Sequence, residues 1–132
     1  FESGGDFGLV VDGVAQRSCL TLAVQVAGRC IDTVEGLTLA DGRLCELQQA
    51  LRARFALQCG FCIPGILMTC AEMLTQRPLP SDDQIAGLLA GHLCRCTGYS
   101  EIVAAVQDVL AATRHRESGL AAAASDSGDR DA

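Results

Sequence analysis

The sequence is poor in aromatic residues and has no cluster of basic side chains. Its 132 residues include no tryptophan, one tyrosine and four phenylalanines, and the formal net charge is −6. Nucleic acids are bound by basic patches and by aromatic rings on which bases stack. This composition therefore argues against a nucleic-acid partner.

Long apolar runs are also missing. No stretch reaches the roughly 18 to 20 apolar residues that a bilayer-spanning helix needs, so no transmembrane segment is expected. Eight cysteines are too few for a disulfide scaffold in a chain of which 49% is hydrophobic. We therefore expect reduced thiols and a cytoplasmic location.

The first third of the chain has the pattern of short β-strands. Apolar stretches at residues 9–11, 19–24 and 31–34 are separated by a turn at Asp12-Gly13 and by further glycines. These stretches predict three short strands.

The middle of the chain has the apolar period of helices, and four apolar stripes predict four helices. The stripes are Leu47, Leu51 and Phe55; Ile66, Leu67, Cys70, Met73 and Leu74; Ile85, Leu88 and Leu89; and Ile102, Val103, Val106, Val109 and Leu110. Pro78 and Pro80 end the second helix, and Ser81 with Gln84 predicts a capping box for the third.

Together these patterns predict an α+β fold. We expect a β-rich part over residues 1–40 and a four-helix part over 41–114. Residues 115–132 lack large apolar side chains apart from one leucine, so we expect a disordered tail.

Four cysteines stand in two short motifs, Cys59-Gly-Phe-Cys62 and Cys94-Arg-Cys96, each followed by a predicted helix. They lie where two helix-to-helix turns are expected to meet. The close C-x-C spacing differs from the C-x-x-C pairs of most zinc sites, so the motifs favour an iron–sulfur cluster. Helix starts would supply positive dipole ends, and Arg95 a cation. Three glycines are expected to let the backbone approach the cluster closely: Gly60, Gly65 and Gly98.

The residues alone leave two other interpretations open. A four-cysteine zinc site would use the same side chains, and four unligated thiols could be buried as small hydrophobes. His92 could be proposed as a Rieske-type ligand, but such a centre needs two histidines, and His115 lies by the tail. Cys70 is expected in the core, and Cys30 and Cys45 have no partner motif.

The stretches around the two motifs, Leu57 to Gly65 and Leu93 to Tyr99, resemble the iron–sulfur subunit of the molybdenum hydroxylases. This is the xanthine oxidase and aerobic carbon monoxide dehydrogenase group. The resemblance spans about residues 9–112 and includes Val11-Asp12-Gly13 and Ser18-Cys19.

The resemblance implies an electron-transfer subunit with a plant-type ferredoxin (β-grasp) part and a four-helix part, each holding one [2Fe–2S] cluster. It implies Cys59, Cys62, Cys94 and Cys96 as the ligands in the helical part. Gln58, which can donate and accept hydrogen bonds, and Cys96 are implied as the residues nearest the molybdopterin.

The implied partners are a molybdopterin-binding large subunit and an FAD-binding medium subunit or another electron acceptor. Electrons would pass from molybdenum through the clusters to FAD, and the substrate would be set by the large subunit. The alternative function is a stand-alone four-cysteine metal-binding or redox-sensing module.

The start of the chain departs from the family pattern. Members read approximately C-E-x-G-x-C-G-x-C before the Val-Asp-Gly strand, whereas residues 1–8 contain no cysteine. Of the four ferredoxin-type ligands only Cys19 remains, and one thiolate cannot hold a cluster. We expect one cluster in the chain as written and two in an intact family member, with an N-terminal piece damaged or outside this sequence.

Overall fold

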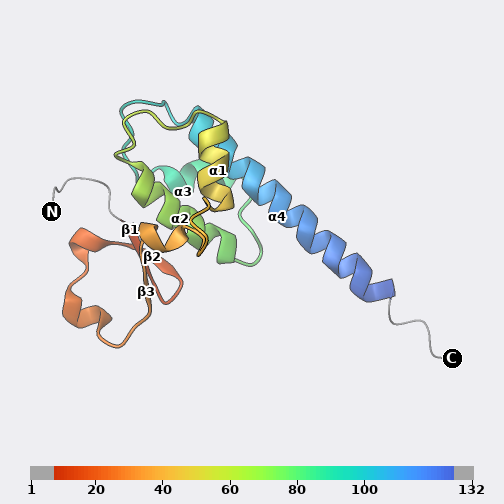
Figure 1. Ribbon diagram of the computed structural model, residues 1–132, viewed down its shortest axis with the longest axis horizontal. Coiled ribbons are helices and arrows are strands. Elements are labelled where there is room, and N and C mark those ends of the chain that lie inside the picture. Colours follow the sequence, from red (N-terminus) through yellow and green to blue (C-terminus); the bar gives the residue numbers. More distant parts are fainter. Residues whose placement is uncertain (1–7, 127–132) are drawn as a thin grey trace.

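The computed structural model describes residues 8–126, with side chains up to residue 120. In this range a three-stranded sheet precedes four α-helices (Figure 1), which confirms the predicted α+β class. No helix in the range is both long and apolar enough to cross a membrane. The strands are Gly8–Val11 (β1), Val14–Arg17 (β2) and Ile31–Asp32 (β3), and the helices are Glu46–Ala53 (α1), Ile63–Thr75 (α2), Asp82–Leu89 (α3) and Ser100–Asp126 (α4).

The sheet is built around the predicted turn at Asp12-Gly13. Both turn residues have positive φ, 48° and 86°, as the tightest hairpin turns require, and Val11 pairs with Val14 directly across the turn. Asp12 also holds Cys30, the residue just before β3. The Asp12 backbone N–H donates to the Cys30 carbonyl and the Asp12 carboxylate accepts the Cys30 N–H, both at 3.0 Å. The strand order is therefore β2-β1-β3, antiparallel throughout.

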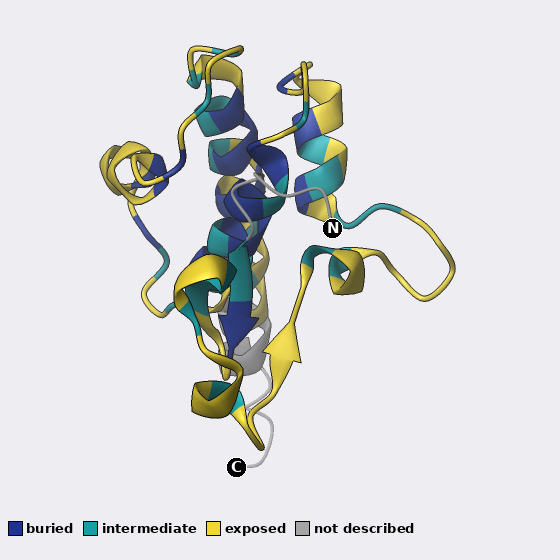
Figure 2. Ribbon diagram, turned by 90° about the vertical axis from the view of Figure 1, so that its left-hand side faces the viewer, coloured by how far each residue is buried: buried dark blue, intermediate teal, exposed yellow. Residues whose placement is uncertain are grey.

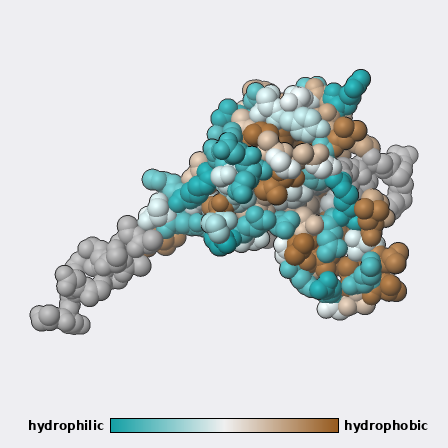
Figure 3. Space-filling view, turned by 180° about the vertical axis from the view of Figure 1, so that it is seen from behind, coloured by the Kyte–Doolittle hydropathy of each residue, from teal (hydrophilic) through white to brown (hydrophobic). Residues whose placement is uncertain are grey.

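The predicted strand at residues 19–24 is wrong. The hairpin turn places β2 at residues 14–17 instead, and the chain then forms two short 3₁₀ segments, Ser18–Leu20 and Ala23–Val26. The side chains of Leu20, Leu22 and Val24 are 78%, 65% and 80% exposed, so nothing among the described residues buries this apolar stretch. The sheet end is largely exposed in Figure 2, and apolar surface gathers on it in Figure 3.

Helix α2 is the central element, because it contacts the sheet as well as the other helices. Its buried side chains include Ile66 and Met68, each with 0% exposure. Strand β1 crosses α2 at Gly8, where an added Cβ would lie 3.0 Å from the Met68 Cβ and 3.3 Å from the Gly65 Cα. Gly65 therefore belongs to the contact between the strand and the helix, and the expectation that it lets the backbone approach a cluster stays a prediction.

The four predicted helices all form, and their stripes meet in one core. The largest fully buried side chains in this core are Leu51, Ile66, Met73, Ile85, Leu89, Ile102, Val106 and Leu110. The expected capping interaction at α3 is present, because the Gln84 side chain accepts the Ser81 N–H at 2.8 Å.

Phe55 does not continue the stripe of α1. The helix ends at Ala53, and Phe55 has a φ of 52° and is 87% exposed. The N–H of Ala56 donates to the Leu51 carbonyl at 2.9 Å and that of Phe55 to the Arg52 carbonyl at 3.1 Å. This is a Schellman closure, which normally places glycine where Phe55 stands. The closure turns the ring to solvent and buries Ala56 instead.

The expected disordered tail is also corrected in part. Helix α4 continues beyond Arg114 to Asp126, and residues 127–132 lie outside the described part of the chain. Alanine has the highest helix propensity of all residues, which favours this extension. Two ion pairs, each at 2.6 Å, hold the start of this extension. Arg116 pairs with Glu46 of α1, and Glu117 pairs with Arg77, which lies just after α2.

The two ends of the α1 stripe should respond differently to truncation. We predict that Leu51→Ala lowers the free energy of unfolding by about 2–5 kcal/mol, because it empties a core position. Phe55→Ala should change it by less than about 0.5 kcal/mol, since the ring is exposed. Urea unfolding of both variants checks this, and a large loss in Phe55→Ala would show that α1 extends as its sequence pattern suggests.

Candidate metal centre

The four motif cysteines meet at one end of the helical core. Cys59 and Cys62 lie in the connection from α1 to α2, and Cys94 and Cys96 in the connection from α3 to α4. The two connections run side by side in Figure 1. Cys62 is the N-terminal cap of α2 and is buried, Cys94 is half-buried, and Cys59 and Cys96 are exposed.

The thiols form two pairs, each with one cysteine from each loop. The Sγ atoms of Cys59 and Cys96 are 3.4 Å apart, with Cys96 as donor. Cys62 and Cys94 form the second pair, because each thiol shifts the pKa of the other. Within residues 8–126, no three His, Cys, Asp or Glu side chains surround one metal-ion position. The donor chemistry, four sulfurs two by two, fits a two-iron core in which each iron takes two protein ligands.

Each pair contains one thiol that ionises easily and one that does not. Burial raises the pKa of Cys94, but the Thr97 hydroxyl, the N–H groups of Thr97 and Cys96 and the Cys62 thiol outweigh it, and the net result is a pKa of about 7. Burial and donation to Cys94 raise the pKa of Cys62 to about 11.

The exposed pair, Cys59 and Cys96, also contains one thiol with a lowered pKa and one with a raised pKa. The Phe61 N–H and then the Cys96 thiol lower the pKa of Cys59, while donation to Cys59 raises the pKa of Cys96. Metal binding requires deprotonated thiols and releases protons. One thiol in each pair is therefore already disposed to lose its proton.

Left-handed backbone shapes both connections that carry the motif cysteines, which we call the ligand loops. Gly60 has a φ of 81° and Gly98 a φ of 64°, as expected for turns that bring the chain close to a bound group. Tyr99 follows with a φ of 68°, a conformation that is uncommon for residues other than glycine.

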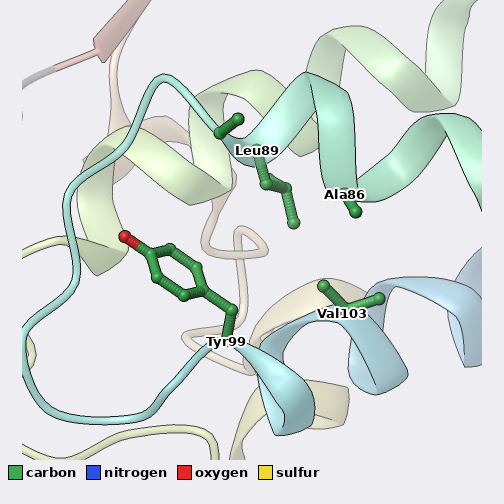
Figure 4. A pocket seen from close by; sticks show the side chains of 5 residues that line it. Ala86, Leu89, Tyr99 and Val103 are labelled. Atoms are coloured by element: carbon green, nitrogen blue, oxygen red, sulfur yellow. The ribbon is translucent and has the colours of Figure 1, made fainter.

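Tyr99 and Thr97 both contact Cys94, and neither residue was predicted to have a role. The Tyr99 hydroxyl accepts the Cys94 N–H at 2.6 Å and donates to the His92 carbonyl at 2.8 Å, while the Thr97 Oγ1 lies 3.0 Å from the Cys94 Sγ. The Tyr99 ring also lines a shallow apolar hollow between α3 and α4 (Figure 4). The only available signal was the Thr-Gly-Tyr that follows the C-x-C motif.

The other candidate residues have different surroundings. His92 is buried, and its Nε2 is 2.7 Å from the Thr69 hydroxyl. Burial and then Arg17 lower its pKa. Cys70 is 1% exposed in the core, as predicted, and burial raises its pKa to about 12. Cys45 caps α1.

Gln58, Arg95, Cys19 and Cys30 are all exposed. Gln58 directly precedes Cys59 in the connection from α1 to α2. The region in which the resemblance places the other ferredoxin-type ligands, residues 1–7, lies outside the described residues.

Comparison with known proteins decides the family. Residues 33–107 match the family described as "[2Fe-2S] binding domain". The chain belongs to this family. All four motif cysteines lie inside the [2Fe–2S]-binding domain.

The relatives of this [2Fe–2S]-binding domain include named small subunits. The chain is 52% identical over 100 residues to "Nicotine 6-hydroxylase small subunit" of Paenarthrobacter nicotinovorans, covering 76% of this chain and 59% of that protein. It is 46% identical over 103 residues to "Xanthine dehydrogenase iron-sulfur-binding subunit" of Escherichia coli O157:H7, covering 76% and 64%. The chain thus spans about three fifths of the length of the curated relatives it matches.

Solved structures of oxidoreductases also match the fold of this chain. Quinoline 2-oxidoreductase from Pseudomonas putida 86 matches with a TM-score of 0.74 and 46% identity, over 82% of this chain and 67% of that one. Aldehyde oxidoreductase from Desulfovibrio gigas matches with a TM-score of 0.75 and 32% identity, over 83% of this chain and 12% of that one. The resemblance to iron–sulfur subunits of the xanthine oxidase group is confirmed.

The spacing and exposure of the thiols predict which disulfide forms first when the chain is prepared without iron. Cys59 and Cys96 are exposed and 3.4 Å apart, and a disulfide needs about 2.05 Å. With glutathione disulfide as oxidant, one thiolate forms a mixed disulfide and releases one glutathione, and the second thiolate then displaces the other. We predict a Cys59–Cys96 bond.

Trypsin can identify that bond. Cleavage after Arg54, Arg95 and Arg114 separates residues 55–95 from 96–114, since Arg77 precedes a proline. A Cys59–Cys96 bond joins the two peptides and survives in Cys62→Ser but not in Cys59→Ser. A bond confined to residues 55–95 would contradict the pairing.

Proposed function

We propose that this chain is the electron-transfer iron–sulfur subunit of a molybdenum-containing hydroxylase or dehydrogenase. The observation that carries the proposal is the meeting of four thiols, two by two, at one end of the core. Cys59, Cys62, Cys94 and Cys96 would hold one [2Fe–2S] cluster. When bound, that group supplies a one-electron carrier.

The chain's own part in the reaction is to hold, orient and insulate that carrier. The chemistry on substrate would take place on a molybdopterin-binding large subunit, and electrons would leave toward FAD on a medium subunit or another acceptor. Relatives named as subunits of nicotine, caffeine and xanthine enzymes support a multi-subunit complex. The cytoplasm is the proposed location, because the eight cysteines are free.

The surface beside the thiols supports a partner at this end. Leu57, Phe61 and Leu93 are 42%, 55% and 86% exposed, and they lie in the two ligand loops. Exposed apolar side chains gathered at one site are typical of an interaction surface. We assign this surface to the large subunit, with Gln58 and Cys96 nearest the molybdopterin.

The sheet end supports a second assignment. Residues 1–40 would belong to a ferredoxin-like (β-grasp) part and residues 41–114 to the four-helix part. The exposed Leu20, Leu22 and Val24 support this assignment as apolar side chains that further β-grasp elements or a partner would cover. An intact family member would hold a second cluster in that part, to which Cys19 would contribute one ligand.

The test is purification of the chain with its partners. We predict that a tagged chain from its native host copurifies with molybdenum and flavin in stoichiometric amounts, and that substrate reduces its cluster. Leu93→Asp should lose the molybdenum while keeping the cluster spectrum, because it places a charge in the partner surface.

Leu120→Asp is the matched control, since Leu120 is 72% exposed on the far part of α4. It should retain the molybdenum. A wild-type chain that purifies as a stable monomer with tightly bound metal, free of molybdenum and flavin, would support the stand-alone module instead.

A further inference from the structure

Thr97 is placed to act on one ligand sulfur. Its hydroxyl oxygen lies 3.0 Å from the Cys94 Sγ, and both side chains are half-buried. Partial burial shields this hydrogen bond from competing water and strengthens it.

The direction of this hydrogen bond follows from which of the two groups has a proton to donate. The Tyr99 N–H donates to the Thr97 Oγ1 at 3.2 Å, which uses the hydroxyl as an acceptor and leaves its single proton free. A cysteine that ligates iron is a thiolate and can only accept. The Thr97 hydroxyl must therefore be the donor to Cys94 when the metal is bound.

The surrounding loop fixes this geometry. The two left-handed residues Gly98 and Tyr99 turn the chain back on itself. The Tyr99 hydroxyl then accepts the Cys94 N–H and donates to the His92 carbonyl. The Cys94 N–H is thus occupied within the loop, whereas the Thr97 hydroxyl is directed at the sulfur.

We propose that the hydrogen bond from Thr97 to Cys94 raises the reduction potential of the bound cluster. This inference rests on the proposed function, because it requires Cys94 to be an iron ligand. Reduction adds negative charge, and a donor to a ligand sulfur stabilises the more negative state. Thr97 is a positioning and tuning residue, since it acts through Cys94.

The experiment is a redox titration of the full chain, reconstituted with iron and sulfide and followed by EPR. Thr97→Val keeps the shape of the side chain but removes the donor, so the potential should become more negative while the cluster is retained. The backbone N–H groups of Thr97 and Cys96, which also stabilise the Cys94 thiolate, are unchanged in this variant. Thr97→Ser should restore the wild-type potential.

Thr113→Val is the matched control, because the Thr113 hydroxyl bonds to the Val109 carbonyl at 2.9 Å within α4. Its potential should equal that of the wild type. If Thr97→Val does not assemble a cluster, Thr97→Ala removes the same donor without a branched side chain.

Two results would overturn the inference: an unchanged potential in the variant without the hydroxyl, or an equal shift in Thr97→Ser, which would indicate a packing effect. A wild-type chain that takes up no two-iron cluster would instead contradict the proposed function, and this inference with it. The wild-type spectrum therefore separates the two failures.

Discussion

The structure depends on one constraint, which is that thiols from two distant loops must meet at one end of the helical core. Cys59 and Cys96 are 37 positions apart in the sequence, yet their Sγ atoms are 3.4 Å apart. Neither loop alone supplies both members of a pair. The register of the helices against one another is therefore what assembles the site.

The helical core supplies that register. Ile66 in α2 and Ile102 and Leu110 in α4 are fully buried, so neither helix can slide without opening the core. Arg54, which caps α1 at the start of the first ligand loop, makes a bidentate ion pair with Asp108 of α4 at 2.7 and 2.9 Å. This ion pair is solvent-exposed, so it orients the two helices more than it stabilises the fold. Most of the folding free energy comes from the apolar packing.

The sequence predicted the features that depend on local pattern. The four helices, the Asp12-Gly13 turn and the Ser81 cap follow from apolar period and turn chemistry, and the burial of Cys70 follows from its stripe. The roles of Thr97 and Tyr99 could not be predicted, because they depend on left-handed backbone that only the folded loop shows.

Three expectations failed where local pattern and tertiary context disagree. Residues 19–24 have strand composition but no strand beside them among the described residues, and Phe55 has helical spacing but follows a helix that has already closed. Residues after Arg114 lack large apolar side chains, but their alanines have high helix propensity and α4 continues through them to Asp126. In each case the deciding contact lies far along the chain or in the backbone itself.

The central claim is that Cys59, Cys62, Cys94 and Cys96 hold one two-iron cluster. Iron and acid-labile sulfide analysis of the reconstituted chain tests it most directly, with the Cys94→Ser and Cys70→Ser variants in parallel. We predict two irons and two sulfides per chain, unchanged in Cys70→Ser and lost in Cys94→Ser. Zinc without sulfide in the wild type, or a full complement of iron and sulfide in Cys94→Ser, would contradict it.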